Sequence, residues 1–161
     1  MKKINALLLP LLLISSLSAN EKLYSFIGIE ASASKFGSEQ LNTFGFKYGT
    51  QTKELRTSIA YNYGKKSDNS YQNILMQIDT GVFKESFKNI PFKPYIGATF
   101  GLIQENSESK DRGYIFGPNV GLSYIINNSL DLDLGYRYLK TAKLNNIDEI
   151  NDLTISMHYF Y

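Results

Sequence analysis

Apolar and polar residues alternate one by one along the last two segments of the chain, Leu130–Tyr138 and Leu153–Tyr161. In the first segment every second residue is Leu or Tyr, and the residues between them include Asp131, Asp133 and Arg137. A period of two predicts a β-strand whose two faces differ in polarity. Charged side chains opposite a face of leucine and tyrosine indicate lipid outside and a polar lumen inside. The pattern therefore predicts strands of a membrane β-barrel.

Six earlier segments repeat this alternation, and each is close to the length of about 9–11 residues that a tilted membrane strand needs. They are Leu23–Ala33, Leu41–Gly49, Leu55–Tyr63, Gln72–Phe83, Pro94–Ile103 and Tyr114–Ile125. An unpaired backbone amide in hydrocarbon costs several kcal/mol, so the sheet must close on itself. We therefore predict an all-β fold, an eight-stranded antiparallel up-and-down transmembrane β-barrel.

The connections between these segments form two alternating classes. Four polar stretches are expected to be long loops outside the cell, namely Ser34–Gln40, Gly64–Tyr71, Gln104–Gly113 and Lys140–Glu149. The other three are expected to be mostly short turns, namely Thr50–Glu54, Lys84–Lys93 and Asn127–Asn128. Long loops on one side and short turns on the other are typical of outer-membrane barrels. Lys84–Lys93 is longer than this pattern favours.

The amino terminus has the features of a secretory signal peptide over residues 1–19. Lys2 and Lys3 precede an apolar stretch, Ala6–Ile14, and Leu17–Ala19 is a plausible cleavage site. The apolar stretch is far shorter than the roughly 20 residues of a membrane-spanning helix. We expect the mature chain, residues 20–161, to be a single barrel domain.

Charge and composition exclude several functions. Two of the 17 basic residues leave with the signal and all 15 acidic residues remain, so the mature formal charge is zero. A neutral chain gives no support to nucleic-acid binding, which normally needs a basic face. The chain has no Cys and one His, so it can form neither disulfides nor a multi-histidine metal centre.

The inward faces of the predicted strands carry charged side chains. In a narrow lumen such charges must be paired, because burying an isolated charge is very costly. One interpretation is a gated ion path; the other, which the small diameter of eight strands favours, is a polar core that plugs the barrel. We expect Arg56 to pair with Asp79 and Asp133 to face His158. The inward charged set is Glu30, Lys47, Arg56, Asp79, Asp131, Asp133, Arg137 and His158.

Glycine and tyrosine add detail to this picture. Inward glycines such as Gly28 and Gly121 fit a crowded interior, although glycine can also mark weak strand positions or bulges. Tyrosines fall in two bands near the two ends of the strands, as amphipathic rings do at membrane interfaces. We place Tyr61 and Tyr114 in the loop-side band and Tyr95 in the turn-side band.

The segments KPYIGATFGL, LDLDLGYRYLK and the ending ISMHYFY resemble the small outer-membrane β-barrel family that includes the OmpA transmembrane domain and OmpX. The resemblance implies a place in the bacterial outer membrane, with its lipids and the barrel-assembly machinery as partners. It also implies that the last strand is the assembly signal, at Met157, Tyr159 and Tyr161. The family's usual final residue is Phe, so Tyr161 departs from the pattern.

Catalysis has to be considered because some small outer-membrane barrels deacylate lipid A with His, Ser and an acid. His158 faces inward and lies within roughly 10 Å of the periplasmic end, whereas lipid A occupies the opposite leaflet. We therefore expect no catalytic residue. Asp148, Glu149 and Asp152 lack the spacing of a cation site, so we expect neither a metal nor a cofactor.

The sequence thus predicts an integral outer-membrane barrel with a structural or surface-interaction role: it stabilises the membrane, or it presents its loops to an extracellular ligand. It is not predicted to be an enzyme. One alternative is a porin for small solutes. The other is a soluble barrel that binds an apolar ligand, which would need its apolar residues inside.

Overall fold

The computed structural model describes residues 23–37, 39–66, 69–81, 89–106, 110–144 and 147–161. These residues form eight strands: β1 (Tyr24–Phe36), β2 (Glu39–Gln51), β3 (Leu55–Lys66), β4 (Asn69–Thr80), β5 (Phe92–Asn106), β6 (Lys110–Asn127), β7 (Leu130–Ala142) and β8 (Glu149–Phe160). No helix in the described ranges is long and apolar enough to cross a membrane. The predicted signal peptide, residues 1–19, lies outside these ranges.

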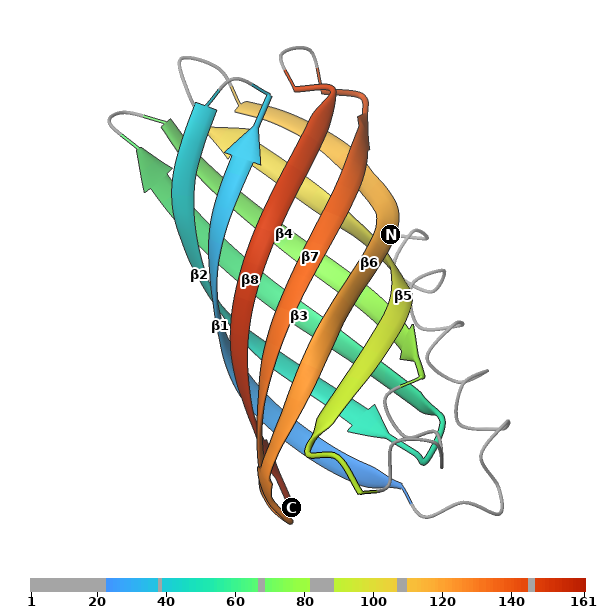
Figure 1. The fold of residues 1–161 in the computed structure, drawn as a ribbon. Helices are drawn as coiled ribbons and strands as arrows, with labels where there is room; N and C mark the ends of the chain where they lie inside the picture. The colour runs from blue at the N-terminus through green and yellow to red at the C-terminus, as the bar shows by residue number, and fades with distance from the viewer. Residues whose placement is uncertain (1–22, 38, 67–68, 82–88, 107–109, 145–146) are drawn as a thin grey trace, which may run out of the picture.

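The strands form one closed barrel in sequence order, each antiparallel to its neighbours (Figure 1). Closure is made by β1 and β8, which pair from Phe26 opposite Phe160 to Phe36 opposite Ile150. Every strand therefore has two partners, and no strand edge is left open. The prediction of an eight-stranded antiparallel barrel is confirmed.

The two faces of the barrel differ as the alternation predicts. Phe46, Ile96 and Leu134 on the outer wall are more than half exposed, at 65%, 58% and 53%. Polar side chains on the same strands are buried inside. A soluble barrel would place these faces the other way round, because apolar surface is favoured away from water. The outer wall is therefore suited to lipid, which argues against the soluble-barrel alternative.

The connections differ from the sequence prediction at one end of the barrel. We call this the loop end: β1–β2, β3–β4, β5–β6 and β7–β8 are joined there only by residues 37–38, 67–68, 107–109 and 143–148. The four long loops are thus replaced by strands that continue through most of those segments. The alternation was hard to see there because outward residues such as Asn42, Gln72 and Gln104 are polar. At the opposite turn end, the longest connection is residues 81–91.

Candidate functional site

The most unusual feature of the interior is its charge. All eight side chains that the alternation places inside are buried, and none is more than 7% exposed. They project from β1, β2, β3, β4, β7 and β8, because inward positions on a strand recur every second residue. They divide into two connected groups, one around Arg56 and one around Arg137.

Arg56 on β3 lies among three carboxylates. Its Nη2 donates to Asp133 Oδ2 at 2.5 Å and its Nε to Asp79 Oδ2 at 3.4 Å. Its Nη1 is 3.9 Å from Asp131 Oδ2, and its guanidinium lies over the Tyr95 ring at 4.9 Å. The expected Arg56–Asp79 pair is therefore present, but Asp133 makes the shorter contact from across the lumen.

Asp79 on β4 is also held by amide groups. It accepts hydrogen bonds from Gln77 Nε2 at 3.0 and 2.9 Å and from Asn119 Nδ2 at 2.7 Å. Asn119 Oδ1 in turn accepts from the Thr99 hydroxyl at 3.0 Å. These bonds extend the Arg56 group to β5 and β6, and they give the buried carboxylate the donors that it needs.

Arg137 on β7 organises the second group. Its Nη2 lies 2.9 Å from Glu30 Oε1, and its Nε donates to Asp152 Oδ2 at 3.1 Å. Lys47 Nζ lies 2.7 Å from the other Glu30 oxygen. Asp152 falls just before the predicted last strand, which begins at Leu153, but it lies in β8 with its side chain inside and is 3% exposed. Asp152 is an even number of residues from Thr154 and His158, so the alternation of the last strand, extended by one residue, would have placed its side chain inside.

His158 pairs with a different residue from the one expected. The register sets it opposite Asp131, and its Nδ1 lies 2.8 Å from Asp131 Oδ1. Asp133 is two residues farther along β7, where it meets Arg56. The His158 ring packs on Phe26, with ring centroids 4.7 Å apart. Glycine at position 28 makes room for it, since a Cβ there would lie 2.5 Å from the ring.

Asp131, Asp133 and His158 bring potential metal-ligand atoms within 4.8 Å of one another. The Arg56 guanidinium already faces both carboxylates, and a metal cation there would be repelled by it. Glu149, one of the acidic residues considered above as a cation ligand, is also paired. It accepts a hydrogen bond from Tyr138 Oη at 2.8 Å and lies 3.5 Å from Lys140 Nζ. The charges inside the described barrel are therefore arranged as ion pairs rather than as a cation site.

The loop half of the lumen is filled by apolar side chains, which the sequence analysis missed. Their signal was present in the alternation. Five of them hold inward positions within the predicted strands, namely Leu41, Ala60, Leu75, Ile103 and Ile115, and four continue the inward positions beyond the predicted ends, namely Phe36, Tyr71, Leu139 and Ile150. Leu144 and Ile147 lie in the connection between β7 and β8. The cluster consists of Phe36, Leu41, Ala60, Tyr71, Leu75, Ile103, Ile115, Leu139, Leu144, Ile147 and Ile150. The lumen is thus closed by two stacked layers, one ion-paired and one apolar.

The tyrosine bands are largely present, with one correction. Tyr61, Tyr63, Tyr114 and Tyr136 are exposed on the outer wall toward the loop end. Tyr95 was assigned to the turn-side band but is 7% exposed and lies inside, against Arg56. Its neighbour Ile96 faces outward, so Tyr95 must face inward.

No protein-family model matches the sequence, and no curated protein matches it. Several solved structures, by contrast, are similar to this chain. Neisserial surface protein A is 20% identical, with 86% of this chain and 97% of that chain covered at a TM-score of 0.69. Outer membrane protein H from Pseudomonas aeruginosa is 20% identical, with 86% and 99% covered at 0.66. The outer membrane enzyme PagL is 13% identical, with 83% and 98% covered at 0.54. These likenesses show that the chain has the fold of small outer-membrane barrels.

Proposed function

We propose that this protein is an integral barrel of the bacterial outer membrane with a structural or surface-interaction role. Outer-membrane lipids surround it, the barrel-assembly machinery inserts it, and the loop end faces the outside of the cell. In this proposal the ion-paired residues Glu30, Lys47, Arg56, Asp79, Asp131, Asp133, Arg137 and His158 stabilise the barrel and close its lumen.

The observation that carries the proposal is the filled lumen inside an apolar wall. A porin needs a continuous aqueous path, and barrels with such channels have more strands. Here Arg56 and Arg137 are engaged by carboxylates inside the lumen, and the apolar cluster fills the lumen farther toward the loop end. A structural role requires the apolar outer wall but no aqueous path through the lumen.

The same reasoning favours a protein without catalytic activity. PagL shares the fold and is an enzyme, so the fold alone does not decide. His158 is 1% exposed, and its Nδ1 is engaged by Asp131. A general base must come within hydrogen-bond reach of its substrate, and a lipid on the outer wall does not reach this ring. Hydrolysis of outer-leaflet lipid that is lost in His158→Ala would overturn this part of the proposal.

Conductance in planar bilayers tests the structural role against the porin. We expect the folded protein to insert without producing discrete current steps. Reproducible steps that change in Arg56→Gln or Arg137→Gln would instead establish a porin. Cell fractionation tests the location, and we expect heat-modifiable gel mobility and extraction by detergent rather than by buffer.

A further inference from the structure

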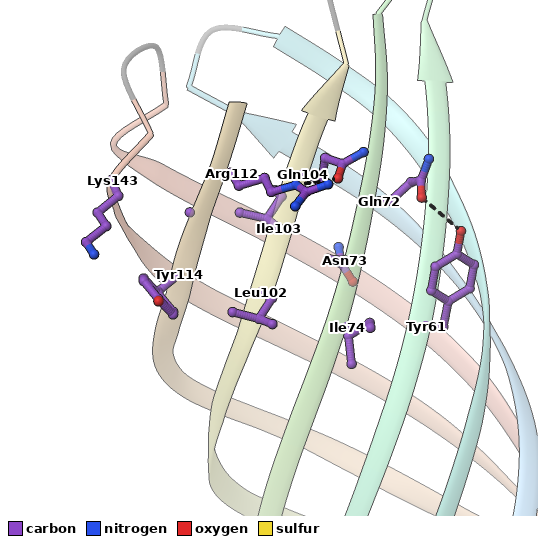
Figure 2. A pocket seen from close by; sticks show the side chains of 11 residues that line it. Tyr61, Gln72, Asn73, Ile74, Leu102, Ile103, Gln104, Arg112, Tyr114 and Lys143 are labelled. Atoms are coloured by element: carbon purple, nitrogen blue, oxygen red, sulfur yellow. Dashed lines mark hydrogen bonds between the residues drawn. The ribbon is translucent and has the colours of Figure 1, made fainter. Parts of the chain in front are cut away.

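A hollow of about 420 Å³ lies on the outer wall near the loop end, across β3 to β6. Its rim combines two tyrosines, Tyr61 and Tyr114, with two cations, Arg112 and Lys143. Figure 2 shows the two sides of the hollow: Arg112, Gln104 and Gln72 lie toward the loop end, and Leu102 and Ile74 lie below them. The hollow therefore crosses the boundary between the polar and apolar parts of the wall.

Strand register produces this arrangement in two rows. Gln72, Gln104 and Arg112 are consecutive partners across β4, β5 and β6 and form the polar row. Two residues closer to the turn end on each strand, Ile74, Leu102 and Tyr114 are partners and form the apolar row. Because outward positions alternate with inward ones, both rows face away from the lumen.

The two cations have no acidic partner among the described residues. Arg112 Nε donates to Gln104 Oε1 at 2.8 Å, which orients the guanidinium but leaves its charge unneutralised. Lys143 Nζ lies 5.3 Å from the centre of the Tyr114 ring. Lys143 has a φ of 67°, a left-handed conformation that is uncommon for a residue other than glycine. By contrast, Lys140 nearby is paired with Glu149.

We propose that this hollow binds a phosphorylated lipid of the loop-side leaflet. Arg112 and Lys143 hold the phosphate, and Ile74 and Leu102 contact the first carbons of an acyl chain. This inference rests on the proposed function, because it requires the barrel to lie in a membrane. A guanidinium can bind phosphate oxygens with two parallel hydrogen bonds, and tyrosines flank headgroups at membrane interfaces.

The lipid source follows from the position of the hollow. The phosphate of a lipid in this leaflet lies at the level where the wall changes from apolar to polar, so Arg112 and the apolar row contact one molecule. A free phosphate would leave Ile74 and Leu102 without a partner. A second hollow, lined by Ile27, Phe46, Ile59 and Met157 among others, presents an apolar wall suited only to acyl chains.

Retention of lipid A by the folded barrel tests the inference. Wild-type protein, Arg112→Gln/Lys143→Gln and Lys35→Gln/Lys65→Gln are each placed in phosphatidylcholine nanodiscs that contain a minor fraction of diphosphoryl lipid A. Native mass spectrometry after transfer to detergent then counts the retained lipid A. Lys35 and Lys65 are exposed on β1 and β3 and do not line the hollow, so their replacement removes the same formal charge without changing its lining.

We expect the Arg112/Lys143 variant to lose retained lipid A by about tenfold, since two charge-assisted contacts are removed, and the Lys35/Lys65 variant to match the wild type. A dephosphorylated lipid A should be retained by none of the three. Equal loss in both variants, or equal retention of the dephosphorylated lipid, would overturn the proposed site while leaving the barrel in the membrane intact. A chain that never enters nanodiscs would overturn both the site and the proposed function.

Discussion

Asp79 on β4 is the residue that links Arg56 on β3 to Asn119 on β6. It accepts from Gln77, Asn119 and Arg56, so its removal leaves donors on β3, β4 and β6 without their acceptor. Removing one partner of a buried ion pair is far more costly than removing an exposed charge. Asp79 is therefore a sensitive test of the interior network.

We expect Asp79→Ala to lower the free energy of unfolding by about 3–5 kcal/mol. The measurement is urea unfolding in detergent micelles, followed by the gel mobility of the folded form. Glu54→Ala is the control, because Glu54 is exposed at the β2–β3 turn and its loss should change the midpoint little. An unchanged melting profile for Asp79→Ala would count against a stabilising Arg56–Asp79 pair.

Gly121 and Gly135 are register partners on β6 and β7, and Tyr95 packs over both. A Cβ at Gly121 would lie 2.4 Å from the Tyr95 ring and 2.6 Å from the Leu134 carbonyl oxygen. This oxygen belongs to the backbone and cannot move away by a side-chain rotation. A Cβ at Gly135 would meet the Thr154 and Tyr95 hydroxyl oxygens at 2.7 and 2.8 Å. Both of these groups end flexible side chains.

We expect Gly121→Ala to destabilise the barrel by about 1–3 kcal/mol, as overpacking does, and Gly135→Ala to cost less. Thermal unfolding of the two variants under identical detergent conditions makes the comparison. The same loss in both would indicate that side-chain displacement, rather than the nearby backbone, sets the cost.

The sequence was sufficient to place charged residues inside but not to pair them all. Parity along a strand assigns a face, and Arg56–Asp79 followed from strand ends alone. The Arg56–Asp133 and Arg137–Glu30 contacts depend on closure of the barrel, which brings β3 opposite β7 and β1 near β7 through β8. His158 was matched to the wrong aspartate because an error of two residues in register keeps the face and changes the partner.

At the scale of the strand, the loop-end extensions are the main addition to the sequence prediction. All eight strands were recognised from their period of two, and their ends were not. Between the loop-side tyrosine band and the loop end, both faces of the strands depart from the membrane pattern. The outward residues there become polar, and the inward residues become apolar. A rule that expects apolar residues outside therefore fails where the outer wall becomes polar.

The outward positions of β2 give a direct test of this boundary. Gln40 and Asn42 precede Phe44 and Phe46 on the same face, and the chain has no native Cys. Spin labels on single cysteines at the first two positions should be accessible to a water-soluble nickel reagent. Labels at the last two should be accessible to oxygen dissolved in lipid. A water-soluble reagent that reaches position 46 would contradict the assignment of faces.

The last strand, β8, presents the proposed assembly signal on the outer wall. Met157, Tyr159 and Tyr161 are exposed and face away from the ion-paired lumen. Their side chains are therefore available to a protein that meets the strand before the barrel closes.

We expect Tyr161→Ala to reduce the folded, heat-modifiable fraction in cells while refolding into micelles proceeds as in the wild type. Tyr124→Ala is the matched control, because Tyr124 is another outward tyrosine near the turn end but lies on β6. Equal assembly of the two variants in cells would argue against a signal at the carboxy terminus.

At the scale of the whole molecule, side-chain bonds across the lumen add to strand pairing. The Arg137 group joins β1, β2, β7 and β8, and the Arg56 group joins β3, β4, β6 and β7. The Thr99–Asn119 bond adds β5. Each strand thus belongs to a bonded group that includes strands other than its two neighbours, so no strand can leave the sheet alone without breaking a buried side-chain hydrogen bond or ion pair.

We therefore expect the barrel to unfold as one cooperative unit, without early loss of the loop end. The chain has no Trp, so Phe92→Trp at the turn end and Tyr63→Trp at the loop end each supply one fluorescent probe on the outer wall. Urea curves from the two variants should share one midpoint and one slope, as two-state unfolding requires. An earlier transition at position 63 would show instead that the apolar layer and the ion-paired layer unfold separately, and that the bonds across the lumen do not couple the two ends.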